Sequence, residues 1–316
     1  MIAYRALAPA KVNLGLFLGP MREQDARHEL VTVMQSISLA DELRLEPAPA
    51  GATEDEVLCP GVSGLPAENL ALAALRAFRA ASGWSAPPLR LSIVKRIPVA
   101  GGLGGGSADA AATLRLARHA SGLGDEELLR ELGTDLGADV PAQVSPGRWL
   151  ATGAGERLHA LPNPSPALGL LVLPAAAELS TAAVYAEAER LGLGREPTEL
   201  EDRRRELRAA LELGAALPAA RELLRNDLEP AAVSLCPEIA GALGKAREAG
   251  AEEALLSGSG PTVVGLFARA NGFGRAQRAA GGLAGHLPTP ISATSVDAVF
   301  ARAVTVAESG PDAGST

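Results

Sequence analysis

Residues 98–111 read PVAGGLGGGSADAA, and five glycines surround Leu103 before a serine and an alanine-rich helical pattern. Glycine allows positive φ angles and a close approach of the backbone to an anion. A helix that begins directly after such a loop points unpaired N–H groups and the positive end of its dipole at the same place. The segment therefore predicts a loop that holds the phosphates of a nucleotide.

Two other nucleotide-binding signatures do not fit this loop. A Walker A loop ends in Gly-Lys-Ser/Thr, but the only Gly-Lys pair, at residues 244–245, is followed by an alanine inside a helical pattern. A dinucleotide-binding fingerprint needs Gly-x-Gly-x-x-Gly, but after Gly102 and Gly104 the last position is Ser107. No acidic ribose partner stands out downstream in a strand pattern. We therefore expect a phosphate loop of another kind.

The flanks of the loop argue against a flexible linker, which is the common role of glycine-serine stretches. A strand-like segment, residues 89–95, precedes the loop, and a helical pattern at residues 107–120 follows it. Ser107 is predicted to cap the N-terminus of this helix.

The composition predicts two domains and a phosphate site that is confined to one place. The chain has 316 residues, of which 47% are hydrophobic and only 3% aromatic, so we expect a large core of Leu, Val and Ala. The net charge of -8 offers no broad attraction for nucleic acid or an anionic membrane, so any phosphate site is local. Neither nucleic acid nor a membrane is an expected partner, and the oligomeric state stays open.

Cysteine and histidine usage predicts no metal centre. Cys59 and Cys236 lie far apart without metal-ligand spacing, and the four histidines are scattered. Two isolated cysteines also suggest a reduced compartment rather than a disulfide framework. The first residues lack the apolar stretch of a signal peptide, and no run approaches the length of a membrane span. We expect a cytoplasmic protein.

The order of the patterns indicates an α+β fold with two domains. The first half mixes strand-like segments at residues 10–18 and 39–48 with a helix at residues 69–82 that Asn69 caps. A helix from Asp125 stops near Asp139 because Pro141 follows. The run PNPSP at residues 162–166 reads as a linker, which divides the chain into an N-terminal mixed βα domain (1–162), a second domain (163–307) and a disordered tail (308–316).

The second domain reads as a ferredoxin-like βαββαβ unit. Strand patterns at residues 168–173, 254–256, 262–267 and 292–300 are separated by helical patterns, among them residues 238–250 and a helix from residue 272. The charged run at residues 198–213 is typical of a solvated helix.

The chain resembles a known family through several segments taken together. These are APAKVNLGL (8–16), HEL (28–30), the glycine loop with its preceding KRI, LGADVP (136–141), RNDLE (225–229) and LLSGSGPTVVGLF (255–267). Over about residues 4–305 their order is similar to that of the galactokinase, homoserine kinase, mevalonate kinase and phosphomevalonate kinase superfamily. The combination points within it to the 4-diphosphocytidyl-2-C-methyl-D-erythritol kinases of non-mevalonate isoprenoid precursor biosynthesis. The resemblance implies a small-molecule kinase fold and ATP-dependent phosphorylation of the acceptor's 2-hydroxyl.

The resemblance implies that Lys11 and Asp139 form the catalytic pair. A carboxylate within hydrogen-bond reach can take the proton of an alcohol, while an ammonium keeps that carboxylate ionised and offsets developing charge on oxygen. The alternatives are a surface carboxylate at a helix end for Asp139 and a solvated strand lysine for Lys11.

By the same resemblance the glycine loop cradles the β- and γ-phosphates of ATP, with Ser107 near the phosphates and their Mg²⁺. No metal ligands are predicted from the protein, because Mg²⁺ binds largely through phosphate oxygens and water. Asn69 and Lys95 are placed beside the adenosine, although a helix cap and a strand-end lysine are equally good interpretations. The predicted ATP-binding residues are Asn69, Lys95, Pro98, Val99, Ala100, Gly101, Gly102, Leu103, Gly104, Gly105, Gly106, Ser107 and Ala108.

For the acceptor, the resemblance places His28 on the cytosine edge and two aromatic residues on the two faces of the cytosine ring. Here Ala26 and Arg27 stand where glycine and tyrosine are usual, so Arg27 either stacks through its guanidinium or is an exposed loop arginine. Tyr185 is the second stacking residue or a core tyrosine, and Thr181, four residues earlier, faces the same ligand. The predicted substrate-binding residues are Asn13, Arg27, His28, Asp139, Thr181 and Tyr185, with the turn at residues 257–262 closing the cleft.

Two other functions are open. One is a kinase of homoserine, mevalonate or a sugar with the same fold, which His28, LGADVP and the missing sugar-kinase signatures disfavour. The other is a non-catalytic nucleotide-binding regulator, since a fold alone does not establish activity. The presence of both Lys11 and Asp139 argues against a regulator.

Overall fold

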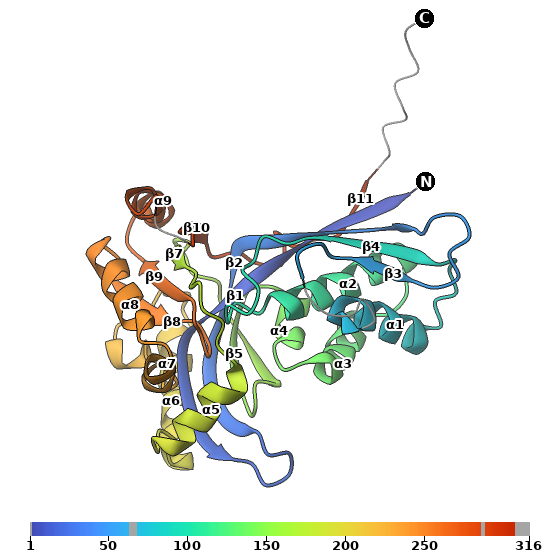
Figure 1. The fold of residues 1–316 in the computed structure, drawn as a ribbon. Helices are drawn as coiled ribbons and strands as arrows, with labels where there is room; N and C mark the ends of the chain where they lie inside the picture. Colours follow the sequence, from blue (N-terminus) through green and yellow to red (C-terminus); the bar gives the residue numbers. More distant parts are fainter. Residues whose placement is uncertain (1, 63–67, 286–287, 307–316) are drawn as a thin grey trace, which may run out of the picture.

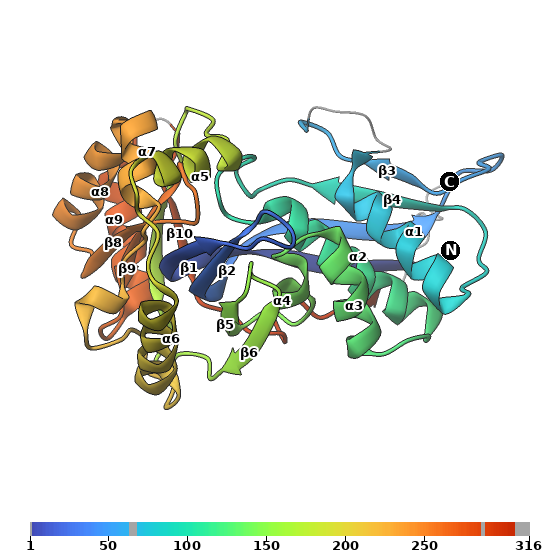
Figure 2. The same cartoon turned by 90° about the horizontal axis from the view of Figure 1, so that it is seen from below.

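Two β-sheets with helices packed on them make up the computed structural model, which describes residues 2–62, 68–285 and 288–306 (Figure 1). The seven-stranded sheet has the order β11 (Val304–Val306), β1 (Ala3–Met21), β2 (His28–Pro47), β4 (Leu89–Val94) and β3 (Glu56–Leu58), while β5 (Arg148–Thr152) pairs with β2 and β6 (Arg157–Leu161). The helices α1 (Leu70–Ser82), α2 (Gly105–Ser121), α3 (Glu126–Leu136) and α4 (Val140–Val144) cover one face of this sheet (Figures 1 and 2).

The long strand β1 is irregular where it carries the predicted site residues. Its pairing with β2 shifts register between Pro9 and Lys11 and again between Asn13 and Gly15. Such bulges re-aim side chains and increase local twist, and they are common beside active sites. The irregularity therefore sets the directions of Lys11 and Asn13 within an otherwise buried strand.

Small residues let α2 pack closely beneath the sheet. Its buried face is built mainly of alanines, which favour a helix and fill little space. The helix begins at Gly105 after Gly104, whose φ of 68° ends the loop. The prediction that Ser107 caps this helix is therefore wrong: the left-handed Gly104 makes the transition three residues earlier, and Ser107 lies within the first turn. Asn69 does cap α1, accepting a hydrogen bond from Ala71 N at 2.9 Å.

The four-stranded sheet has the order β10 (Ile291–Thr294), β7 (Gly169–Leu173), β9 (Val263–Phe267) and β8 (Glu253–Leu256), with every pairing antiparallel. The predicted ferredoxin-like βαββαβ order is confirmed. The expected strand at residues 292–300 is shorter, because Ser295 bridges to Ile37 and Val296 N donates to Ser36 O at 3.0 Å. The backbone there bonds to β2 of the other sheet.

Helices α5 (Thr181–Arg190), α6 (Pro197–Leu211), η2 (Arg221–Leu223), α7 (Glu229–Leu235), α8 (Glu238–Glu248) and α9 (Gly272–Gly282) complete the described chain. As predicted, α6 is largely solvated and buries three leucines. No helix in the described ranges has the length and apolar character needed to cross a bilayer. The division at residue 162 stays a prediction, and β11 pairs with β1 of the first sheet. The predicted tail, 308–316, lies outside the described residues.

Candidate active site

Two cavities meet at the glycine loop. The first, of about 560 Å³, is lined by residues 98–107, by Asn69 and Lys95 and by neighbouring side chains. The second, of about 650 Å³, is lined by residues from β1, β2, α5 and the loop before α4. Gly102, Gly104 and Ser107 line both cavities. The loop therefore forms the boundary between two adjoining spaces for ligands.

Lys11 and Asp139 lie at this boundary, in the second cavity. Lys11 Nζ is 3.4 Å from Asp139 Oδ2 and donates to Asn13 Oδ1 at 2.8 Å. The backbone N of Lys11 donates to Leu103 O at 2.9 Å, which fixes β1 against the glycine loop. Lys11 is only 7% exposed, so its ammonium faces the carboxylate with little screening by water.

A chain of hydrogen bonds fixes the amide of Asn13. Its Nδ2 donates to Thr32 Oγ1 at 2.8 Å, and that hydroxyl donates to Gly15 O at 2.6 Å. The amide oxygen is therefore held toward Lys11 Nζ. Because all three side chains are buried, the position of the ammonium is determined by the strand pair β1 and β2.

The glycine loop is crowded and has positive φ at two positions. Gly102 has φ of 72°, and a Cβ there would lie 2.4 Å from Ser257 O. Gly104 has φ of 68°, and a Cβ there would lie 3.0 Å from Lys11 Cγ. The positive φ favours glycine at both positions, and at Gly102 the nearby backbone oxygen also excludes a Cβ.

The turn at residues 257–262 presses on the loop from the second sheet. Ser257 Oγ donates to Gly102 O at 3.2 Å. Asn226 holds this turn: its Nδ2 donates to Leu256 O at 3.0 Å and to Gly258 O at 2.6 Å, and its Oδ1 accepts from Leu228 N. Sequence reasoning used RNDLE only as a family match and missed this role of Asn226.

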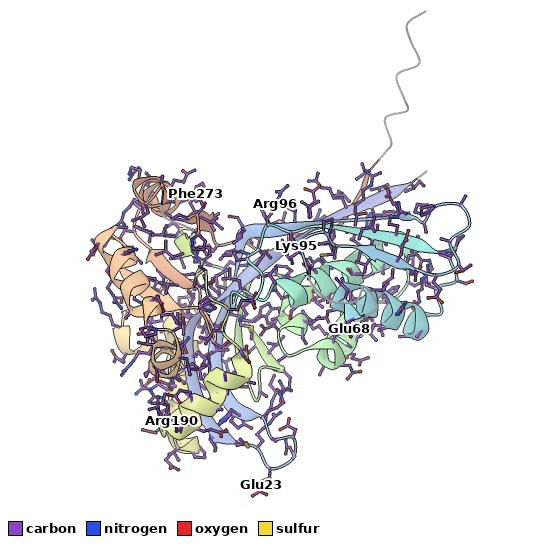
Figure 3. All side chains as sticks on the ribbon, viewed as in Figure 1. Glu23, Glu68, Lys95, Arg96, Arg190 and Phe273 are labelled. Carbon is purple, nitrogen blue, oxygen red and sulfur yellow. The ribbon has the colours of Figure 1, made fainter. Side chains whose placement is uncertain are left out.

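Lys95 sits at the end of β4 on the face that the helices cover, beside the exposed Arg96 (Figure 3). Its Nζ donates to Asp41 Oδ2 at 2.5 Å and to Asp109 Oδ2 at 2.7 Å. Burial raises the pKa of Asp109 to about 7, with Lys95 opposing and Asp41 adding to the shift. The two carboxylates raise the pKa of Lys95 although burial opposes them. Both acids were missed from sequence, because only the fold brings β2, β4 and α2 together here.

The far end of the second cavity holds an aromatic and charged cluster. His28 Nδ1 is 2.9 Å from Gly19 O, and its Nε2 is 2.8 Å from Glu189 Oε1. The rings of His28 and Tyr185 have centroids 5.5 Å apart at an interplanar angle of 39°. Burial, with the charge of Asp139 added, raises the pKa of Tyr185 to about 12, so its phenol stays protonated at neutral pH.

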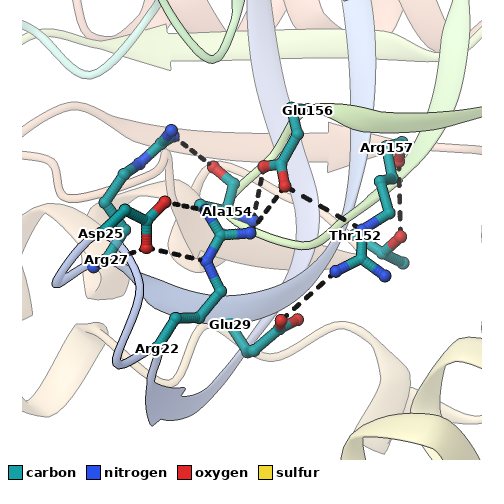
Figure 4. A network of polar contacts seen from close by, with 8 residues as sticks. All are labelled: Arg22, Asp25, Arg27, Glu29, Thr152, Ala154, Glu156 and Arg157. Carbon is teal, nitrogen blue, oxygen red and sulfur yellow. Dashed lines mark hydrogen bonds and ion pairs between the residues drawn. The ribbon is translucent and has the colours of Figure 1, made fainter.

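The connection between β1 and β2 is fixed to the β5–β6 turn by charged contacts (Figure 4). Arg22 Nε donates to Asp25 Oδ1 at 3.0 Å, and its Nη1 donates to Glu156 Oε1 at 2.6 Å. The hydrogen bond from Arg22 lowers the pKa of Asp25. Arg27 Nη2 donates to Ala154 O at 2.9 Å, which holds its guanidinium at the rim of the second cavity.

The structure brings nearly all predicted site residues to the two cavities. Every predicted ATP-binding residue except Ala108 lines the first cavity; Ala108 is buried in α2 behind it. Every predicted substrate-binding residue lines the second, where Thr181 Oγ1 is 2.9 Å from Ser259 Oγ. Within the described part of the chain, no group of three or more His, Cys, Asp or Glu residues could hold a metal ion.

Known families match the chain in two segments. Residues 69–147 match the GHMP kinases N terminal domain, and residues 199–283 match the GHMP kinases C terminal family. A 4-diphosphocytidyl-2-C-methyl-D-erythritol kinase of Kineococcus radiotolerans is 42% identical over 275 residues, which are 84% of this chain and 81% of the relative. The relative of the same name from Pelotomaculum thermopropionicum is 43% identical, covering 83% and 88%. This chain belongs to the 4-diphosphocytidyl-2-C-methyl-D-erythritol kinase family.

Solved structures agree with membership of this family. A crystal structure of 4-(cytidine 5'-diphospho)-2C-methyl-D-erythritol kinase has a TM-score of 0.73 and 34% identity, and the match covers 92% of this chain and 98% of that one. The homoserine kinase of Cytophaga hutchinsonii has a TM-score of 0.72 at 16% identity, covering 96% and 97%, and shows the shared fold alone. The predicted family, the α+β kinase fold and the ATP-dependent small-molecule kinase class are confirmed.

Proposed function

We propose that this chain transfers the γ-phosphoryl group of ATP to the 2-hydroxyl of 4-diphosphocytidyl-2-C-methyl-D-erythritol, giving the 2-phosphate and ADP. The observation that carries this assignment is the junction of two cavities at Gly102, Gly104 and Ser107, with Lys11 and Asp139 beside it. A nucleotide in the first cavity and an alcohol in the second would meet at that junction. The reaction belongs to the formation of isoprenoid precursors without mevalonate.

Asp139 is the group that takes the proton from the acceptor hydroxyl in this proposal. An alcohol becomes a better nucleophile as its proton leaves, and a positioned carboxylate can accept that proton. Lys11 lies 3.4 Å away and balances negative charge as the new P–O bond forms. Because phosphoryl transfer depends mainly on positioning and on neutralising charge, the fixed geometry of Lys11 matters as much as the base.

The first cavity is assigned to ATP. Residues 98–108 follow the triphosphate, where the N-terminus of α2 directs its free N–H groups at the β- and γ-phosphates. Asn69 and Lys95 line the same cavity and are placed beside the nucleoside. The nucleotide thereby extends toward Ser107 and the second cavity.

Mg²⁺ fits this site as a companion of the triphosphate. The described residues offer no three-residue cage of acids, histidines or cysteines. This suits an ion that takes most of its ligands from phosphate oxygens and water. Ser107, which lines both cavities, is the side chain placed next to the phosphates and the ion. When bound, the ion supplies positive charge to the phosphate oxygens.

The second cavity is assigned to the acceptor. Asn13 holds Lys11 beside the reacting hydroxyl, Thr181 contacts the middle of the acceptor, and His28 with Tyr185 receives the cytosine. Arg27 covers the base from the rim through its guanidinium, held by Ala154 O. A cytoplasmic location, where ATP is plentiful, is part of this proposal.

ADP release across a panel of alcohols tests the assignment. The purified chain is given ATP, Mg²⁺ and either cytidine-diphosphate methylerythritol, homoserine, mevalonate or galactose. We expect ADP release with the cytidine compound alone. Turnover of another alcohol would transfer the assignment to that substrate, and no turnover with any alcohol would support a nucleotide-binding regulator.

A further inference from the structure

Helix α5 presents three side chains to the second cavity at four-residue spacing, namely Thr181, Tyr185 and Glu189. Residues four apart lie on one face of a helix, so the three side chains form a line along the cavity wall. Thr181 and Tyr185 already have places in the proposed acceptor site. Glu189 has none, although it is the residue of the three that contacts His28.

The hydrogen bonds of His28 determine which atoms carry protons. Gly19 O only accepts, so His28 Nδ1, 2.9 Å away, is the donor of that bond. A neutral imidazole has one N–H, which this contact uses. The contact of 2.8 Å between His28 Nε2 and Glu189 Oε1 therefore holds a second proton. An ionised Glu189 can only accept, so with Glu189 ionised this proton lies on His28 Nε2, and the cavity offers an N–H donor directly beside a carboxylate acceptor.

This donor and acceptor suit one pyrimidine and oppose the other. The pairing edge of cytosine has the acceptor N3 beside the N4 amino donor, whereas uracil has an N3–H donor beside the acceptor O4. A carboxylate accepts readily from the cytosine amino group, which is one of the usual side-chain pairings to this base. With uracil in the same position, the His28 N–H would face the N3–H donor and the Glu189 carboxylate would face the O4 acceptor. Neither pair can form a hydrogen bond, and buried polar groups without a partner are costly.

Glu189 is able to exchange its partner for a base. Its side chain is 45% exposed, whereas that of His28 is 10% exposed. Among the described residues, His28 is the only basic side chain within ion-pair distance of Glu189. Glu189 can therefore turn outward while His28 stays anchored to Gly19 O, which opens a gap between the donor and the acceptor. Tyr185, one turn earlier on α5, supplies a ring beside that gap.

We propose that Glu189 accepts a hydrogen bond from the amino group of cytosine and, with His28, sets the preference of this chain for cytidine over uridine. This inference rests on the proposed function, since it requires a cytidine-bearing acceptor. Glu189 is thereby a substrate-contacting specificity residue, distinct from the pair that performs the phosphoryl transfer.

The test compares kcat/KM for cytidine-diphosphate methylerythritol and its uridine counterpart in the wild type and in Glu189→Gln. The glutamine amide can donate as well as accept, so it tolerates the O4 of uracil. We expect the cytidine-to-uridine ratio to fall on the order of 10- to 100-fold, mainly through a lower KM for the uridine acceptor. The KM for ATP stays at the wild-type value, because Glu189 does not line the first cavity.

Glu187→Gln is the matched control. Glu187 lies on the same helix, but its carboxylate bonds to Arg190 and Ser234 and does not line the cavity. The base preference of this variant should equal that of the wild type. A Glu189→Gln variant with the wild-type ratio, or a Glu187→Gln variant with the same loss, overturns the role of Glu189.

Equilibrium binding of CDP and UDP to the wild type gives a second measurement that needs no variant. The inference requires tighter binding of CDP, and equal affinities contradict it. Failure of the proposed function is a separate result: the wild type would then leave the cytidine acceptor unphosphorylated even at saturating concentration.

Discussion

Lys11 Nζ lies 3.4 Å from Asp139 Oδ2, although α1, α2 and α3 separate the two residues along the chain. Lys11 is held by Asn13 and by the bond from its backbone to Leu103 O. Asp139 stands at the N-cap position of α4, where its carboxylate makes no capping hydrogen bond and is free to face Lys11. An ammonium and a carboxylate therefore lie together beside the phosphate loop.

Replacing Asp139 by asparagine tests the role of the carboxylate. The amide keeps the size of the side chain but cannot take up the proton, so we expect turnover to fall roughly 10²- to 10⁴-fold. ATP affinity should change little, and kcat with KM for ATP would be measured by coupled ADP detection. Asp135→Asn, an exposed change at the end of α3, is the control. Wild-type turnover in Asp139→Asn would remove this residue from the mechanism.

Replacing Gly104 by alanine tests the loop as a positioning device. The φ of 68° disfavours alanine, and the added methyl would lie 3.0 Å from Lys11 Cγ and 3.1 Å from its Cε. We expect kcat to fall roughly 10²-fold, since small displacements of a positioned group cost about this much. Gly244→Ala, which has open space within α8, should retain activity and gain about 0.5–1 kcal/mol of stability. Activity at the wild-type level in Gly104→Ala would show that the contact with Lys11 is not required.

The glycine loop and the helices around it could be predicted because their signals are local. Asn69 caps its helix as expected. The spacing of the strand patterns in the second half of the chain was enough to predict the ferredoxin-like order of that sheet. The start of α2 was misplaced, because serine is a common cap and the left-handed conformation of Gly104 is not visible in sequence. Local sequence patterns therefore predict that a helix or strand exists better than they predict the residue at which it begins or ends.

The polar contacts that support the site could not be predicted in the same way. Asp41 and Asp109 meet Lys95 only through the stacking of α2 on the sheet, and Asn226 bonds to Gly258 O, 32 residues further along the chain. Each looks like an ordinary strand, helix or loop residue in sequence. The positions of Lys11 and Asp139 were inferred from family resemblance, since spacing alone says nothing about their separation.

Asn226 is expected to support both stability and activity. Replacement by alanine leaves Leu256 O and Gly258 O without their amide donor in a buried setting, which costs about 1–3 kcal/mol. The turn that contacts Gly102 would also lose its anchor, so kcat/KM should fall. Urea denaturation gives the first effect and steady-state kinetics the second. Asn163→Ala, at an exposed position, serves for comparison. An unchanged unfolding midpoint in Asn226→Ala would contradict this account.

Asp109 should make stability depend on pH in a defined direction. Burial raises its pKa to about 7, while in the unfolded chain the carboxyl titrates near 4. Between these values the folded chain holds a proton that the unfolded chain releases, so the stabilising contribution of Asp109 is complete below about pH 4 and is lost as pH rises through 7.

Asp109→Asn removes this proton and keeps an amide oxygen for Lys95. The free energy of unfolding of the wild type minus that of Asp109→Asn should therefore decrease from pH 5 to pH 8, by at most about 1.4 kcal/mol per pH unit. Denaturant titrations at several pH values measure it, with Asp135→Asn controlling for loss of a charge. Parallel pH curves for the wild type and Asp109→Asn would show that Asp109 is already ionised in the folded chain, and Lys95 would then sit between two full negative charges.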